Sequence, residues 1–163
     1  MILDHYTIFI EEVLEKLHEF KIDVSSFEMD HIGYQASSNE DYDRLREEFD
    51  KLGNRISEEI VGGRRVGIYT LNNPLQYQQY IIPVIELIAP KEGQICPSAL
   101  EHVEFVIQES FESFIKRYSN ISWDVSAINQ KDFPMVKLKL NTYIQVKFHV
   151  MPVLEILEHI KHA

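Results

Sequence analysis

Cysteine is almost missing from this chain. Among its 163 residues Cys96 is the single cysteine, so neither an intrachain disulfide nor a cysteine-rich zinc site can form. No obvious base stands beside Cys96 in the sequence, and we expect its thiol to pack and not to act as a nucleophile. Long apolar runs are missing as well, so no segment is predicted to span a membrane.

The chain has fewer basic than acidic residues. The chain has 16 Lys and Arg against 26 Asp and Glu, a formal net charge of −10 with His neutral. A surface of that sign repels phosphate backbones, so no nucleic-acid partner is expected. Residues 1–5 lack the basic region and cleavage site of a signal peptide, which predicts a cytoplasmic protein. The length and the 45% hydrophobic content fit one globular domain or two fused half-domains.

The most informative stretch is residues 100–107, which reads as a strand with two different faces. Its apolar face carries Val103 and Phe105, and the other face carries His102 and Glu104. Two metal-competent side chains on one face are unusual in a simple core strand. The order acid, His, β-branched residue occurs a second time, at Asp30-His31-Ile32.

The remaining pattern places this echo inside a duplicated order of elements. An N-terminal helix is predicted over about 5–21, and a C-terminal helix over about 152–161. Between them, strand-helix-strand-strand-strand occurs twice, with module one over about 26–90 and module two over about 98–150. The predicted strands are 27–35, 55–61, 64–71, 79–89, 100–107, 121–128, 135–140 and 143–150, with turns at Gly62-Gly63 and Asn72-Asn73-Pro74.

Polar residues in the first and last strand of each module form a candidate site. Module one offers His31 and Glu86, and module two offers His102 with Lys147 or His149. Glu86 lies in a very apolar strand, where a carboxylate is costly to bury unless a cation meets it. A divalent ion would meet that need. The alternatives are a core histidine at position 31 and an ion pair of Glu86 with Lys147 or an arginine.

These motifs resemble a known group of proteins. Asp30-His31-Ile32, Ile85-Glu86-Leu87, Glu101-His102-Val103-Glu104 and the strand ending Val146-Lys147-Phe148-His149 are similar to the bacterial YecM-like family of the vicinal oxygen chelate superfamily. That superfamily includes glyoxalase I, extradiol dioxygenases and bleomycin- and fosfomycin-resistance proteins. The resemblance implies an α+β fold in which two βαβββ modules form one cupped mixed sheet over residues 1–163, with extra N- and C-terminal helices.

The resemblance also implies one metal held by the first and last strands of both modules. His31, Glu86 and His102 match three ligand positions, and His149 is the candidate for the fourth. Aligning the prolines that follow the two last strands places Phe148, not His149, opposite Glu86, so a bulge would be needed to turn His149 into the cleft. The cofactor expected is Zn, Ni, Mn or Fe.

Three hypotheses for function remain open. The first is a metal-dependent isomerase, lyase or oxidoreductase acting on a small oxygen-rich metabolite, with Glu104 as general base and Lys147 as an electrostatic partner of substrate oxygens. The second is a non-catalytic ligand-binding protein that uses Tyr69, Tyr77 and Tyr143. The third is a structural domain with a metal-free polar cleft. The expected partner is a small molecule, and a homodimer is one alternative for the oligomeric state.

Overall fold

The structure is a computed structural model that describes residues 2–163. Its elements follow the order α1 (Tyr6–Glu19), β1 (Glu28–Gln35), α2 (Asn39–Leu52), β2 (Gly53–Val61), β3 (Arg64–Tyr77), β4 (Tyr80–Ile88), β5 (Ala99–Val106), α3 (Phe111–Arg117), β6 (Val136–Lys139), β7 (Gln145–His149) and α4 (Val153–Lys161). No helix within residues 2–163 is long and apolar enough to cross a membrane.

The strands form one curved mixed sheet in the order β2-β3-β4-β1-β5-β7-β6. The pairs β1–β4 and β5–β7 are parallel, and β1 pairs with β5 antiparallel at the centre. The two first strands of the repeat are therefore neighbours, and the last strand of each module flanks its own first strand. This arrangement confirms the α+β fold with a cupped mixed sheet.

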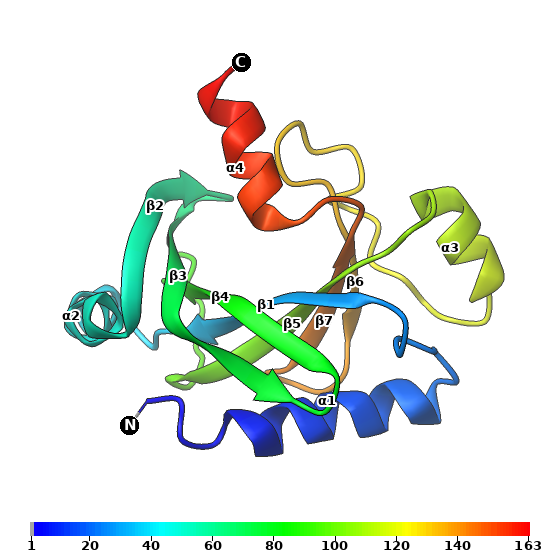
Figure 1. Ribbon diagram of the computed structural model, residues 1–163, viewed down its shortest axis with the longest axis horizontal. Coiled ribbons are helices and arrows are strands. Elements are labelled where there is room, and N and C mark those ends of the chain that lie inside the picture. The colour runs from blue at the N-terminus through cyan, green and yellow to red at the C-terminus, as the bar shows by residue number, and fades with distance from the viewer. Residues whose placement is uncertain (1) are drawn as a thin grey trace.

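Local signals in the sequence explain the helices that surround this sheet. The Ser38 hydroxyl accepts a hydrogen bond from the Asp41 amide and caps α2, and Ser110 caps α3 through the Ser113 amide. Figure 1 shows α1, α2 and α3 around the outside of the curved sheet, and α4 at its open side. The two-residue turn of the β2–β3 hairpin is made by Gly62 and Gly63, whose φ angles of 59° and 80° suit glycine.

Two apolar clusters lie on the two sides of the sheet. The larger joins the outer helices to alternate strand residues, among them Phe49 of α2, Phe105 of β5 and Phe114 of α3. The smaller joins β3 and β4 to α4 through residues such as Ile68 and Leu157. Alternation along β5 thus sends Phe105 into the larger core and leaves His102 and Glu104 on the other side, as the sequence predicts.

The predicted strand over 121–128 is wrong. Within the described residues this segment joins the sheet only through an isolated bridge between Asp124 and Lys137. The Asp124 carboxylate instead accepts hydrogen bonds from the amide and hydroxyl of Ser126, which stabilises a turn in competition with a ladder. Module two therefore contributes β5, β6 and β7 to the sheet. The eighth strand that the sequence predicts does not form within the described residues.

The predicted turn at Asn72-Asn73-Pro74 is also wrong. The strand β3 continues to Tyr77, and the register shifts between the pairs Thr70–Val84 and Leu75–Ile82. The three residues are an exposed bulge inside one long strand, where the missing N–H of Pro74 costs no ladder bond.

The outer core generates a stability prediction. Phe105 is fully buried and its ring stacks on Phe148 at a centroid distance of 5.7 Å. We expect Phe105→Ala to lower the free energy of unfolding by about 3–5 kcal/mol in urea denaturation, because it removes a large apolar side chain and leaves a cavity. Ile8→Ala, at a position 62% exposed, is the control and should change it by less than about 0.5 kcal/mol.

Candidate functional site

The site is built where the two central strands cross the floor of the cup. In the β1–β5 pairing, His31 lies opposite Glu104 and Gly33 lies opposite His102. The parallel neighbour β4 brings Glu86 beside Gly33. As a result His31, Glu86, His102 and Glu104 each offer one ligand atom, and these four atoms lie within 4.8 Å of one another. Residues separated by up to 73 positions (104 − 31) are thus brought into one group.

Two β-bulges place a carboxylate beside each histidine. In β1, Met29 pairs with Phe105 and His31 with Glu104, so Asp30 is the extra residue. In β5, the extra residue between the pairs of Leu100 and His102 is Glu101. A bulge cancels the strict alternation of side chains, so an acid and the histidine that follows it can lie on the same side of the sheet.

Each of these carboxylates binds the inner nitrogen of its histidine. The His31 Nδ1–Asp30 Oδ2 distance is 2.7 Å, and the His102 Nδ1–Glu101 Oε2 distance is 2.5 Å. A carboxylate in this position keeps the proton on Nδ1 and leaves the Nε2 lone pair available. The echo of acid and histidine in the sequence therefore corresponds to a repeated carboxylate–imidazole pair.

Within residues 2–163, the outer nitrogens of the two rings have no hydrogen-bond partner. His31 Nε2 lies 2.7 Å from Glu104 Oε2 and 3.1 Å from Glu86 Oε2, and His102 Nε2 lies 3.9 Å from Glu86 Oε2. Neither oxygen near His31 lies along the direction in which a ring N–H points, so these short contacts are not hydrogen bonds.

The electrostatics of the group favour a positive charge at its centre. Burial alone would lower the pKa of His31, but the carboxylates of Glu104 and Asp30 outweigh it and hold this pKa well above its usual value. Burial opposes ionisation of Glu86, yet contact with His31 and attraction to Lys147 lower its pKa to about 2. The pKa of Glu104 is held well below its usual value against burial, mainly by His149 and His31.

Gly33 makes room for the His102 ring. A Cβ atom added at Gly33 would lie 2.0 Å from Cε1 of His102, so any larger residue would displace the imidazole. By the symmetry of the β1–β5 pairing, the corresponding position in module two is Glu104, two residues after His102 as Gly33 is two residues after His31. Glycine in module one makes room for a ring, and module two has a glutamate at the same position.

The sheet register identifies the counterpart of Glu86 as Lys147. Glu86 of β4 is paired with Gly33, and Lys147 of β7 is paired with Glu104. The proline alignment that placed Phe148 there is therefore wrong, because Phe148 points into the outer core. The predicted ion pair between Glu86 and Lys147 is not formed either: in the described chain, no carboxylate lies within 4.0 Å of the Lys147 ammonium.

His149 lies beside the group of four and not within it. It is on the cup side of β7, as its alternation predicts, and needs no bulge to reach the cleft. Its Nδ1 lies 3.1 Å from Glu104 Oε1, and its Nε2 lies 3.4 Å from Asp30 Oδ2. Among the predicted ligands, His31, Glu86 and His102 are brought together. Glu104, which was predicted as a base, is the fourth member of this group, and His149, which was predicted as the fourth ligand, is not in it.

Comparison with known proteins identifies the family of the chain. The YecM protein family model matches residues 1–152. The chain belongs to the YecM family. An uncharacterized protein of Haemophilus influenzae is 28% identical over 114 residues, which cover 68% of the chain and 60% of that relative. The chain thus spans less than two thirds of the length of this curated relative.

Solved structures place this YecM-family chain in the vicinal oxygen chelate fold. A structure described as Structural Genomics, Protein EC4020, has a TM-score of 0.81 at 22% identity, covering 97% of this chain and 90% of that one. A variant of Streptomyces coelicolor methylmalonyl-CoA epimerase in complex with 2-nitronate-propionyl-CoA has a TM-score of 0.55 at 12% identity, covering 76% and 94%. Both likenesses concern the fold alone.

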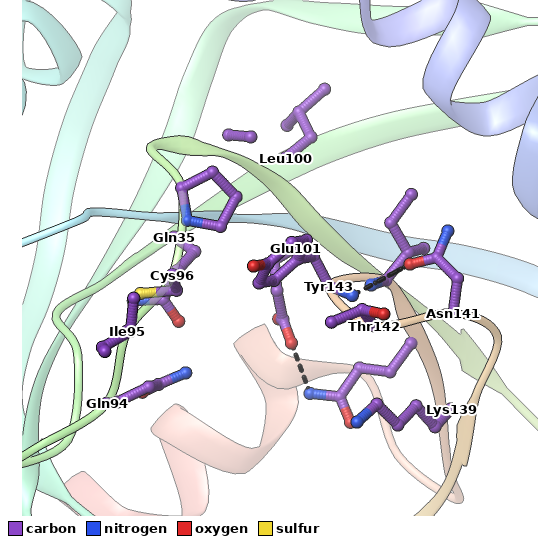
Figure 2. Close-up of a pocket in the computed structure, with 14 residues that line it drawn as sticks. Gln35, Gln94, Ile95, Cys96, Leu100, Glu101, Lys139, Asn141, Thr142 and Tyr143 are labelled. Atoms are coloured by element: carbon purple, nitrogen blue, oxygen red, sulfur yellow. Dashed lines mark hydrogen bonds between the residues drawn. The ribbon is translucent and has the colours of Figure 1, made fainter.

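Two cavities of the YecM-family chain are lined by residues of the site or their partners. The larger, about 620 Å³, is lined by His31, Glu86, Glu104, Lys147 and His149 together with apolar residues of β2, β3 and α4. The smaller cavity, about 380 Å³, is lined in part by Glu101. Figure 2 shows Glu101 at this hollow, where its carboxylate accepts a hydrogen bond from the Gln145 side chain at 2.5 Å. Gln145 lines both cavities.

The tyrosines expected to hold a ligand do not gather in the larger cavity. Tyr69 is fully buried in the outer core, and Tyr77 packs against that core from β3. Tyr143 is half exposed and lines the smaller cavity, where Figure 2 labels it. Aromatic composition did not reveal which face of a strand each ring would take.

Sequence reasoning missed Asp30 and Glu101 as partners of the histidines. Strict alternation assigns them to the opposite face from His31 and His102, because a bulge has no sequence signature of its own here. The usable signal was the repetition of an acid directly before each histidine. Asp30 has a further role, because its Oδ2 atom also accepts a hydrogen bond of 3.0 Å from the Val153 amide at the start of α4.

The contact between Gly33 and His102 can be tested by a double-mutant cycle. We expect Gly33→Ala to lower the free energy of unfolding by about 1–3 kcal/mol, because the new methyl group overlaps the imidazole ring. In a His102→Ala background the same change should cost at least about 1 kcal/mol less, since the clash is gone. Equal costs in both backgrounds, measured by urea denaturation, would contradict this packing.

Proposed function

We propose that this YecM-family chain is a divalent-metal-dependent enzyme acting on a small oxygen-rich metabolite in the larger cavity. The metal ligands would be His31, His102, Glu86 and Glu104. The observation that carries the proposal is the pair of Nε2 atoms that have no hydrogen-bond partner among residues 2–163, each on a ring whose Nδ1 is bound to a carboxylate and each within 3.9 Å of a glutamate oxygen.

The donor chemistry fits Zn, Ni, Mn or Fe. Two imidazoles and two carboxylates form a mixed nitrogen and oxygen set, with no thiolate to favour a softer ion. When bound, such an ion supplies Lewis-acid polarisation of a substrate oxygen. Isomerase, lyase and oxidoreductase chemistry are all compatible with that role.

The neighbouring residues take positioning roles in this proposal. Asp30 and Glu101 orient the two imidazoles, and His149 holds Glu104 through its 3.1 Å contact. Glu104 is better suited to bind a cation than to act as general base, because a carboxylate whose pKa is far below 7 takes up a proton poorly at neutral pH. Lys147 remains the candidate electrostatic partner of substrate oxygens.

The partly apolar larger cavity also suits a second candidate function, a small-ligand-binding protein without turnover. The larger cavity then serves as a binding space whose polar floor orients the ligand. The two candidates differ in turnover, not in ligand binding. In the third alternative the cluster is a structural ion-pair network, and it would bind neither metal nor ligand.

A metal titration tests the proposal. Protein purified without a histidine tag and stripped with a chelator should bind one ion per chain in isothermal titration calorimetry with Zn, Ni, Mn or Fe(II). We expect His31→Ala and His102→Ala to abolish measurable binding. Asp30→Asn and Glu101→Gln should weaken it by about 10–100-fold, because the imidazoles lose their orienting partner.

His159→Ala is the matched control, since His159 is exposed on α4 and outside the cavity. It should leave the affinity unchanged. Binding that survives the double variant His31→Ala/His102→Ala would place the ion elsewhere and contradict the proposed site.

The raised pKa of His31 predicts that the metal-free protein loses stability at alkaline pH and that the metal-loaded protein does not. In the metal-free protein, His31 stabilises the fold as imidazolium, so this contribution is complete below the unfolded pKa of about 6.5 and is lost as pH rises through the folded pKa. The thermal midpoint of the metal-free protein should fall on the alkaline side. The metal-loaded protein should not show this loss, because the ion replaces the proton. His31→Gln should remove the alkaline loss, and an unchanged profile in that variant would contradict the assignment.

A further inference from the structure

The larger cavity has an apolar wall as well as a polar floor. Val66 and Ile68 of β3 and Val153 and Leu157 of α4 belong to the inner apolar cluster and also line the cavity. Such a wall contributes to binding in proportion to the apolar area that a ligand covers, so it favours a ligand with an apolar body. The helix α4, which supplies half of these residues, lies beyond the residues 1–152 matched by the family model.

The floor of the same cavity holds a buried cation with unused hydrogen-bonding capacity. Lys147 is only 5% exposed and lines the cavity from β7. Its ammonium group has three donors, yet among residues 2–163 it forms neither a hydrogen bond nor an ion pair within 4.0 Å. The Lys147 nitrogen is not among the fully enclosed polar atoms without a partner, so the ammonium is open to the cavity, and an acceptor on a ligand there can receive its hydrogen bonds.

The charges on the cavity floor decide where the charged head of a ligand can bind. Asp30 and Glu101 are occupied by the two Nδ1 atoms. On the proposed function, the carboxylates of Glu86 and Glu104 would be balanced by a divalent ion. Asp30 and Glu101 stay negative, because a hydrogen bond to a neutral imidazole does not cancel the charge of a carboxylate, so an anionic head can bind only beside Lys147, whose ammonium donors are free within residues 2–163.

We propose that the cavity binds monocarboxylic acids with an apolar chain, the carboxylate at Lys147 and the chain against the wall formed by β3 and α4. This inference rests on the proposed function, because without the ion the two glutamates would repel an anion. The proposed ligand has an anionic head and an apolar body, and the contribution of each to binding can be tested separately.

The test uses simple probes on chelator-stripped and metal-loaded protein. Calorimetric titration of the loaded protein with butyrate, hexanoate and octanoate should show an affinity that rises about threefold to fourfold per methylene group. Hexan-1-ol has the same chain without the charge and should bind at least about tenfold more weakly than hexanoate, since it lacks the charge-assisted hydrogen bond. Hexylamine should not bind detectably.

Variants separate the two contacts. Lys147→Met keeps the chain length and removes the charge, so it should lower the affinity for hexanoate at least about tenfold and leave that for hexan-1-ol unchanged. Leu157→Ala should weaken octanoate more than butyrate, because only the longer chain reaches the wall. Ile156→Ala is the matched control, as Ile156 is buried on the same helix but does not line the cavity.

The outcomes distinguish this inference from the proposed function. If metal binds but affinity is independent of chain length, or hexylamine binds as well as hexanoate, the inference is overturned and the metal site stands. If Lys147→Met loses no affinity for hexanoate, the carboxylate position is overturned. Should Lys147→Met fail to fold, the comparison of hexanoate with hexan-1-ol on the wild-type chain decides the same point. Hexanoate binding to the chelator-stripped protein as tight as to the loaded protein would overturn the inference, which needs the ion to balance Glu86 and Glu104, and the metal titration tests the proposed function separately.

Discussion

The structure depends on two contacts between a carboxylate and the inner nitrogen of an imidazole, Asp30 with His31 and Glu101 with His102. Each contact exists because a bulge in a central strand places an acid on the same side as the histidine that follows it. The contact fixes the ring and leaves its outer nitrogen facing the cup. A regular ladder would place the two side chains on opposite faces, and neither ring would be held in this way.

The duplicated modules bring the central strands together, and the positions at which the two modules differ decide which side chains meet there. Gly33 and Glu104 occupy equivalent positions, as do Glu86 and Lys147. A fully symmetric site would carry either two ring-accommodating glycines with two glutamates, or two glutamates with two lysines. The mixed set instead collects His31, His102, Glu86 and Glu104 around one point and leaves a single lysine beside them.

The open side of the cup is connected to the same contacts. Asp30 binds His31 and also accepts the first free amide of α4, so the helix that forms part of the cavity wall is anchored to the carboxylate that orients a histidine. His149 lies within 3.4 Å of that carboxylate and within 3.1 Å of Glu104. Displacing α4 would therefore remove apolar wall and alter the environment of His31 together.

The sequence by itself determined the order of elements apart from 121–128, the apolar face of each central strand, and the convergence of His31, Glu86 and His102, because alternation and duplication are periodic patterns that one chain records directly. Tertiary structure alone decided that Asp30 and Glu101 turn inward, that Lys147 and not Phe148 corresponds to Glu86, and that 121–128 forms a turn. The first two depend on a register between strands distant in sequence, where a shift of one residue reverses the face of every side chain that follows, and the third depends on the hydrogen bonds of Ser126 with the Asp124 carboxylate. Residue identity along one strand carries no record of which partner residue lies opposite.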